Sequence, residues 1–536
     1  MRTKFLDKPY LVWSVLFIVA PLIMVVYYAF TDKTGAFTIS NMAQIPNYLS
    51  TILLSVLYGI AATAICLLLG YPFAYFLSKH TVRTQQTIVL LVMLPMWMNF
   101  LIRTYSLMTI LGGSGVINTL LNKMHLGSLN LINNGGAVIL GMVYNFLPYM
   151  ILPIYSVLSK LDNSLVEAAQ DLGSNRTTVF RRVIIPMSLP GILSGVTMVF
   201  VPCVSTFYIT QKLGGGQIVL IGDVIESQFQ SANNYNLGAA LSFVLMILIF
   251  ICLGVMNHFD SGTEDGGKKS SAISKVYMAI IFAFLYAPIV VMTVFSFNST
   301  TSTYQMEGLS LHWWEEMFKN SEAMTALKNT VVLAVITAAV STVLGLAAAV
   351  GLFNSKRKLY KRSMMTVTNI PMMNPEIVTG ISMMLLFVFG ASLIKISDVL
   401  GFWTLLIAHI TFCLPYVILN VLPKLRQLDI NVYEAALDLG CKPFKAFMKV
   451  IMPEIMSGII TGCVMSFTLS LDDFIISYFT NGPSFQTLPI YIFSLTKKRV
   501  KPDMFALSTL MFVTILVLLV LMNVAQSRAE KKEAKH

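Results

Sequence analysis

The sequence is poor in charge. Only 12% of its 536 residues are charged, about half of the share that is usual in a soluble globular domain. Hydrophobic residues make up 56% of the chain, and the mean hydropathy is +0.74. This composition excludes an ordinary soluble protein and indicates a chain that folds in lipid.

Sequence patterns for metal, disulfide and nucleotide sites are also missing. The six cysteines are scattered without paired spacing, so neither a disulfide framework nor a zinc site is predicted. The six histidines, His409 among them, form no HExxH or comparable pattern. Residues 262–268 have the glycine spacing of a phosphate-binding loop, but Lys269 stands where Ser or Thr should bind magnesium. We therefore expect no catalytic residues, no metal and no cofactor in this chain.

Apolar runs, in contrast, are abundant. Twelve of them are about 20 residues long, enough for a helix to cross ~30 Å of hydrocarbon. The first run has no small-residue cleavage site and is interpreted as a retained helix, not a signal peptide. The predicted spans lie near residues 10–30, 51–77, 88–111, 136–158, 187–211, 237–257, 276–297, 328–353, 364–390, 401–422, 455–480 and 504–524. The predicted fold is an all-α polytopic membrane protein with about 12 transmembrane helices.

The net charge of +12 follows the predicted topology. With the N-terminus inside, the inner segments hold 26 of the 37 Lys and Arg residues. This is the positive-inside pattern, which predicts that both termini are cytoplasmic. The basic excess therefore indicates membrane topology, and no nucleic-acid partner is expected.

The chain also repeats itself at an offset of 267 residues. The phrase EAAQDLG begins at Glu167, and EAALDLG begins at Glu434. Further matching pairs, such as Pro186 with Pro453, extend the repeat. Six spans in each half give both halves the same orientation, which predicts two parallel six-helix repeats. We divide the chain into a first half at 1–259, a cytoplasmic linker at 260–275, a second half at 276–524 and a charged cytoplasmic tail at 525–536.

Each copy of the repeated phrase predicts a helix–turn–helix along the cytoplasmic face. The segments 167–186 and 434–453 carry too many charges to lie in hydrocarbon. Gly173 and Gly440 offer the left-handed position that ends a helix, and a proline follows nineteen residues after each glutamate. Such segments are either ordinary amphipathic connectors or two docking sites for a two-fold symmetric cytoplasmic partner.

These motifs resemble a known family. The pattern E-A-A-x-x-x-G, with its downstream proline, is similar to the EAA loop of ABC importer permeases. The stretches 220–229, 401–417 and 466–495 resemble the spermidine/putrescine permeases of that class, and the two halves resemble a natural fusion of the two permease subunits. One departure is Ser457, where the longer EAA pattern has proline.

The resemblance implies partners and roles. It implies two copies of a cytoplasmic ATPase that carry ATP and magnesium, an extracytoplasmic polyamine-binding protein, and a bacterial inner-membrane location. The residues that it assigns to ATPase coupling are Glu167, Ala168, Ala169, Gly173, Glu434, Ala435, Ala436 and Gly440.

Two adjacent aspartates are the strongest candidates for substrate contact. Asp472 and Asp473 lie inside a predicted span, where carboxylates are costly and usually functional. Neighbouring residues on a helix point ~100° apart, so we expect one on the pathway and one in an interhelical network. Their counterparts in the first half are Ser205 and Thr206, so the carboxylates are not duplicated. Anchoring of helix contacts is the alternative role.

Glu376 is the other intramembrane carboxylate. Pro371 and Pro375 flank it, which predicts a broken helix of the kind found at transporter binding sites. A polyamine also requires aromatic faces, although each aromatic could equally serve in packing or interfacial anchoring. The remaining candidates for the pathway are Ser470, Trp97, Trp313, Tyr48 and Tyr208.

Three functional classes fit a membrane protein of this kind. Polyamine import driven by ATP agrees best with the duplicated loops. A permease for another small solute, or a secondary transporter with six plus six spans, is the alternative. A membrane enzyme or receptor is the third class, for which the sequence shows no set of catalytic residues.

Overall fold

A computed structural model describes residues 8–161, 163–257, 272–302, 306–396, 399–496, 502–514 and 516–517. This part of the chain is helical, and its only β pairing consists of two isolated bridges. A helix satisfies its own backbone hydrogen bonds, as a chain surrounded by lipid must. Nine of the described helices are long and apolar enough to span a membrane, or up to eleven if each of two bent pairs counts as one span. The predicted linker, apart from the start of α16 at Ala272, and the predicted tail lie outside the described residues.

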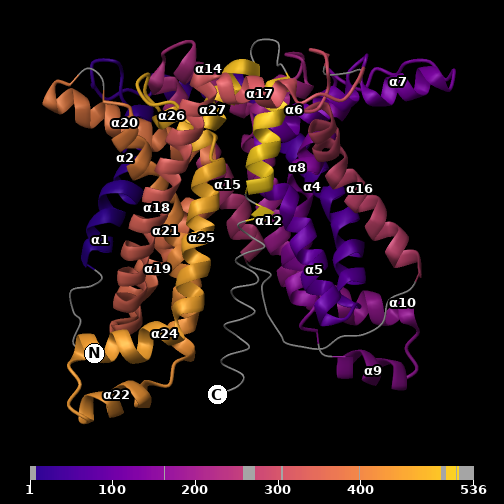
Figure 1. Ribbon diagram of the computed structural model, residues 1–536. Coiled ribbons are helices and arrows are strands. Elements are labelled where there is room, and N and C mark those ends of the chain that lie inside the picture. Colours follow the sequence, from indigo (N-terminus) through magenta and orange to yellow (C-terminus); the bar gives the residue numbers. More distant parts are fainter. Residues whose placement is uncertain are drawn as a thin grey trace. The chain divides into compact units, whose positions relative to one another are not determined.

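The chain forms two compact units. Unit 1 comprises residues 1–27, 318–495 and 513–536, and unit 2 comprises residues 28–317 and 496–512. In unit 1, three long helices pack on one another: α18 (Ser321–Asn354), α21 (Phe402–Gln427) and α25 (Met456–Asp472). Their counterparts in unit 2 are α4 (Leu49–Ser78), α8 (Gly135–Leu158) and α12 (Leu189–Ser205). Figure 1 shows both bundles.

Glycines allow the bundle helices to approach closely. A Cβ at Gly345 would lie 2.6 Å from a methyl carbon of Val417, and one at Gly462 would lie 3.0 Å from the Val417 Cα. Lipid chains are as apolar as the side chains, so close packing, more than the hydrophobic effect, holds such helices together.

The first helix of each sequence half packs on the other half's unit. The N-terminal arm, which consists of α1 (Lys8–Ser14), η1 (Val15–Val19) and α2 (Ala20–Ala29), joins unit 1. There the Tyr10 hydroxyl bonds to that of Thr368 at 2.6 Å, and the Trp13 indole N–H donates to Thr411 at 3.1 Å. Helix α16 (Ala272–Phe295) joins unit 2, where the Tyr277 hydroxyl donates to the Leu69 carbonyl at 2.6 Å. Each unit therefore contains the first helix of the sequence half that forms most of the other unit.

Four predicted spans are interrupted. The span predicted at 88–111 divides into α5 (Val82–Met93), a 3-10 turn over Leu94–Trp97 and α6 (Phe100–Leu111), so our prediction of one continuous helix there is wrong. The span at 364–390 divides into α19 (Lys358–Met373) and α20 (Glu376–Ile394), and the break predicted beside Glu376 is confirmed. Both breaks follow prolines, which lack the N–H that helix continuation requires.

The other two interruptions fall at equivalent positions of the repeat. Helix α12 ends at Ser205 and is followed by the short α13 (Tyr208–Leu213), while α25 ends at Asp472 and is followed by α26 (Ile475–Thr480). Between them, Thr206 and Asp473 have extended backbones, with φ/ψ of −66°/146° and −61°/126°. The spans predicted at 187–211 and 455–480 therefore each contain one longer and one short helix.

Candidate functional site

The two EAA segments form matching helix–turn–helix elements. Helix α9 (Asn163–Asp171) and helix α22 (Ile430–Asp438) are each followed, two residues later, by a glycine with positive φ. The φ angle is +80° at Gly173 and +84° at Gly440. In the first copy, the Gly173 N–H donates to Gln170 O and the Ser174 N–H to Ala169 O. The second copy repeats both bonds one for one. This pattern is the Schellman motif, so the left-handed, helix-ending conformation predicted for both glycines is confirmed.

The outer face of each EAA segment is exposed. Glu167, Ala168, Glu434 and Ala435 are exposed. At the turns, Leu172 and Leu439 are 87% and 88% exposed. The two copies therefore present the same residue types at equivalent exposed positions.

The inner face of each segment is anchored in its own unit. Ala169 packs against the core of unit 2, and Ala436 packs against a core cluster of unit 1 that includes Tyr433. Burial raises the pKa of Tyr433. In each segment a second helix follows the turn, Thr177–Met187 in the first copy and Pro443–Glu454 in the second. The first meets α12 at a bend of 62°, and the second meets α25 at a bend of 73°. A force applied to either segment therefore acts directly on a long bundle helix.

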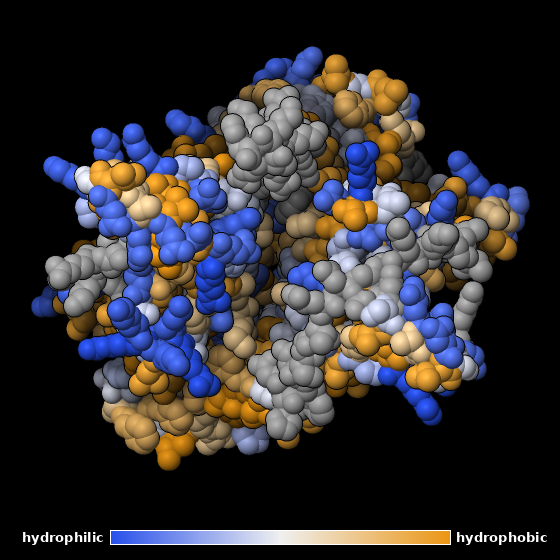
Figure 2. All heavy atoms as spheres, turned by 90° about the horizontal axis from the view of Figure 1, so that it is seen from below, coloured by the Kyte–Doolittle hydropathy of each residue, from blue (hydrophilic) through white to orange (hydrophobic). Residues whose placement is uncertain are grey.

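Hydrophilic side chains are abundant at the EAA-segment end of each unit. Figure 1 shows α9 and α22 each at the lower end of its own bundle, and Figure 2 is the view from below. Arg181, Arg182, Lys445 and Lys449 are exposed there. Their position agrees with the predicted cytoplasmic side.

In unit 1, the two interrupted spans bring two helix breaks close together. Helices α20 and α26 pack closely, because a Cβ at Gly380 would lie 3.3 Å from the Ile475 carbonyl oxygen. Glu376, the first residue of α20, is exposed. The breaks at Glu376 and at Asp473 are therefore neighbours, although they are 97 residues apart in the sequence.

Asp473 is part of a hydrogen-bond network. Its carboxylate accepts from the Ser477 N–H at 2.7 Å and from the Ile476 N–H at 3.4 Å, so it caps α26. The side chain is 6% exposed, and one of its oxygens lies 3.4 Å from Nε2 of His409 on α21. Asp473 thus occupies the interhelical position that we expected for one of the two aspartates.

Asp472 has a different environment. It is the last residue of α25 and is half-buried. Ser470, two residues earlier, is buried, and its hydroxyl lies 2.8 Å from Nδ1 of His409. Of the carboxylates at the two breaks, Glu376 is exposed and Asp472 is half-buried.

The four aromatic candidates belong to unit 2. Tyr208 is in the core of unit 2, where its hydroxyl donates to Leu101 O at 3.1 Å. Trp313 lies in α17 (His312–Lys319) and donates its indole N–H to Thr300 O at 3.2 Å. Tyr48 is half-buried in a 3-10 turn before α4. Trp97 ends the turn before α6, and its side chain is outside the described part. The contacts of Tyr208 and Trp313 agree with packing, which is the alternative role of the aromatic candidates.

The equivalent region of unit 2 is built from other residues. Asp223 of α14 (Ile221–Gln230) accepts from the Thr210 hydroxyl of α13 at 2.8 Å. Helix α6 begins with Phe100 where α20 begins with Glu376, and the ring of Phe100 lies 5.9 Å from that of Tyr208. Arg103 is buried and donates from Nη1 to the Pro95 carbonyl at 2.6 Å. This bond joins the two sides of the break in unit 2.

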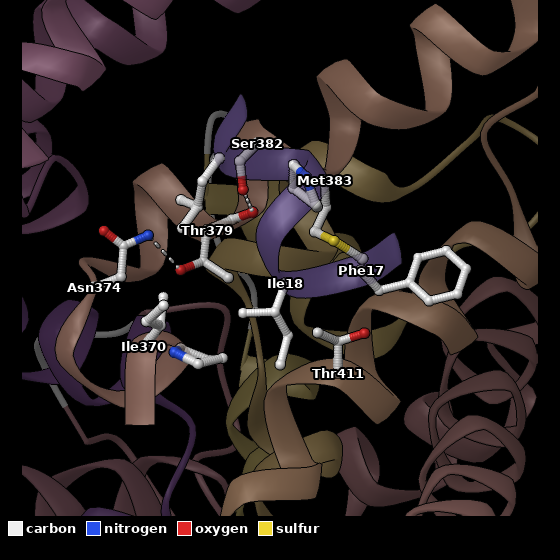
Figure 3. Close-up of a pocket in the computed structure, with 11 residues that line it drawn as sticks. Phe17, Ile18, Ile370, Asn374, Thr379, Ser382, Met383 and Thr411 are labelled. Carbon is white, nitrogen blue, oxygen red and sulfur yellow. Dashed lines mark hydrogen bonds between the residues drawn. The ribbon is translucent and has the colours of Figure 1, made fainter. Parts of the chain in front are cut away.

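The break in unit 1 is held by neutral groups and borders a small cavity beneath the N-terminal arm. The Asn374 amide donates to the Thr379 hydroxyl at 3.1 Å, and the Ser382 hydroxyl donates to Thr379 O at 2.8 Å. Figure 3 shows these bonds together with Phe17 and Ile18 of the arm.

Sequence reasoning missed His409 and Arg103 as parts of these breaks. His409 forms no sequence pattern with its partners, because they lie 61 to 68 residues away. Arg103 could have been found, because an arginine within an apolar run is itself a signal of function.

The chain belongs to the family described as binding-protein-dependent transport system inner membrane component. The family profile matches twice, over residues 68–265 and 341–534. The chain is therefore a membrane permease of that family with two permease domains in one polypeptide.

Curated relatives are single permeases. One is the spermidine/putrescine transport system permease protein PotB of Haemophilus influenzae, 39% identical over 253 residues, which are 45% of this chain and 88% of the relative. Another is PotC of the same system in Escherichia coli, 38% identical over 246 residues, which are 46% of this chain and 90% of the relative. The match of each relative to less than half of this chain agrees with a fusion of two permeases.

Among solved structures, a bacterial alginate ABC transporter in complex with an alginate-bound periplasmic protein is similar. It has 15% sequence identity and a TM-score of 0.38, and the match covers 48% of this chain and 94% of the other.

Proposed function

We propose that this chain is the transmembrane component of an ATP-driven importer for polyamines, spermidine or putrescine. The observation that carries the proposal is that Glu376, Asp472 and Asp473 all lie at two adjoining helix breaks of unit 1. A flexible polycation needs several carboxylates, and carboxylates within a membrane need a cationic ligand or strong donors. The names of the two relatives support the same substrate class.

The proposed partners follow from the two ends of the bundles. Two copies of a cytoplasmic ATPase, which supply ATP and magnesium, would bind the exposed faces of α9 and α22. A polyamine-loaded binding protein would deliver substrate on the other side of a bacterial inner membrane, with both termini of this chain in the cytoplasm. Closure of the ATPases would then move α12 and α25 through the bends that join them to the docking segments.

Uptake in proteoliposomes tests this proposal. The chain, reconstituted with its ATPase and binding protein, should take up labelled spermidine or putrescine only when ATP is present on the ATPase side. Uptake driven by an ion gradient without ATP would instead support a secondary transporter. Uptake of an uncharged solute in place of polyamines would contradict the substrate class and leave the class of importer intact.

A further inference from the structure

His409 lies at the centre of the α25–α26 break. It projects from α21 and is buried, and both of its ring nitrogens have partners. Nδ1 lies 2.8 Å from the Ser470 hydroxyl of α25, and Nε2 lies 2.8 Å from the Ser477 hydroxyl of α26. Nε2 is also 3.4 Å from Asp473 Oδ2. One imidazole thus connects three helical segments.

The partners of the imidazole determine which nitrogen carries the proton. An ionised carboxylate only accepts hydrogen bonds, so the Nε2 atom that faces Asp473 is the one that carries hydrogen. Nδ1 then accepts from the Ser470 hydroxyl. This assignment is made from the hydrogen-bond network. With a neutral imidazole, each ring nitrogen and its partners then have matching donors and acceptors.

The same carboxylate accepts the two backbone N–H groups at the start of α26. Asp473 is therefore fixed from two sides, by α26 and by His409. Because Asp472 precedes it in the chain, any rotation of Asp473 would change where the Asp472 carboxylate points. The close packing of α20 on α26 extends the same constraint to Glu376.

Unit 2 builds its equivalent break without this network. The residues at the repeat-equivalent positions of His409, Ser470 and Asp473 are Met142, Cys203 and Thr206. Met142 and Cys203 are fully buried and belong to the apolar core of unit 2. A carboxylate near that break, Asp223, is held instead by the Thr210 hydroxyl and the Leu220 N–H. The histidine network is therefore particular to unit 1 and is not a requirement of the bundle.

We infer that His409 is a positioning residue for polyamine binding, which acts by holding Asp473 and the α25–α26 break so that Asp472 and Glu376 face the substrate. The inference rests on the proposed function. His409 itself does not contact the substrate.

The test measures binding of labelled spermidine to the full-length chain in nanodiscs. His409→Met, which installs the residue found in unit 2, should weaken binding about tenfold to a hundredfold, the range expected when a hydrogen bond to a charged group is lost. His409→Gln, which keeps one donor and one acceptor, should restore most of the affinity. Thr411→Val, which removes another buried hydrogen bond of α21, is the matched control and should bind like the wild type.

A double-mutant cycle separates positioning from a general structural role. If His409 acts through Asp473, the variant His409→Met/Asp473→Asn should bind within about twofold of Asp473→Asn alone. Losses that multiply, or wild-type affinity in His409→Met, would overturn the inference while the proposed function stood. Absence of spermidine and putrescine binding in the wild type would overturn the proposed function, and the inference with it. Should His409→Met not fold, His409→Asn is used in the same cycle.

Discussion

The interrupted spans of the two units have similar backbones and opposite chemistry. In both units a long helix ends at an extended residue, Thr206 or Asp473, and a six-residue helix follows. Unit 1 has Asp472, Asp473 and His409 at this break, whereas unit 2 has Ser205, Thr206 and Met142 at the repeat-equivalent positions. The repeated backbone provides the helix ends, and the residues placed on them provide specificity.

The largest expected effect comes from breaking the feature that the units share. Glu167→Lys combined with Glu434→Lys should reduce ATP-dependent uptake to a few percent of wild type, because both docking faces would carry the wrong charge. The measurement is co-purification of the ATPase together with uptake. Each single variant should have an intermediate effect of similar size in the two units. Full ATPase binding by the double variant would exclude these faces as the docking sites.

The next effect should be confined to unit 1. Asp472→Asn should lower spermidine uptake roughly 30-fold, which corresponds to about 2 kcal/mol for one interaction with a charged group. The matched change in unit 2, Ser205→Ala, should leave uptake within about twofold of wild type. Equal losses in both units would mean that the comparison between them has no functional content.

A third prediction moves the charge of unit 1 into unit 2. Thr206→Asp should destabilise the chain by about 3 kcal/mol, because a buried carboxylate there would lack the histidine that Asp473 has. Adding Met142→His should recover about half of that loss. Thermal unfolding in detergent measures both, with Thr206→Asn as the neutral control. An unchanged melting temperature in Thr206→Asp would show that the break in unit 2 is already hydrated.

The smallest effects concern the bonds across the proline-containing breaks. Arg103→Gln should cost about 2 kcal/mol of stability, since it removes a charge-assisted bond to the Pro95 carbonyl. Asn374→Ala should cost about 1 kcal/mol, because its bond to Thr379 is between neutral groups. Arg103→Lys, which keeps the charge and a donor, should lie between Arg103→Gln and wild type. The reverse order of the two losses would contradict this account.

Sequence reasoning succeeded where the determinant is local. The left-handed positions of Gly173 and Gly440 follow from turn chemistry within a few residues, and the break beside Glu376 follows from its flanking prolines. Hydropathy gave most span positions, because burial in lipid is a property of composition. It missed the break at 94–99, since an apolar turn is as hydrophobic as an apolar helix.

Tertiary neighbours could not be predicted in the same way. The contact of His409 with Ser470 and Ser477 depends on how α21 meets α25 and α26. The neighbouring positions of Glu376 and Asp473 depend on the packing of α20 on α26. The sequence predicted which of these residues are chemically unusual, apart from His409, and the fold brought them together.

The first helix of each sequence half packs in the other half's unit, and this determines the order in which contacts can form during synthesis. The partners of Tyr10 and Trp13 lie 358 and 398 residues further along the chain. During synthesis the N-terminal arm must therefore wait in the membrane until the second half has been inserted. Helix α16 meets residues that were made earlier, such as Leu69. Because two permease domains are joined in one chain, each N-terminal arm is always synthesised together with one copy of the residues that it contacts.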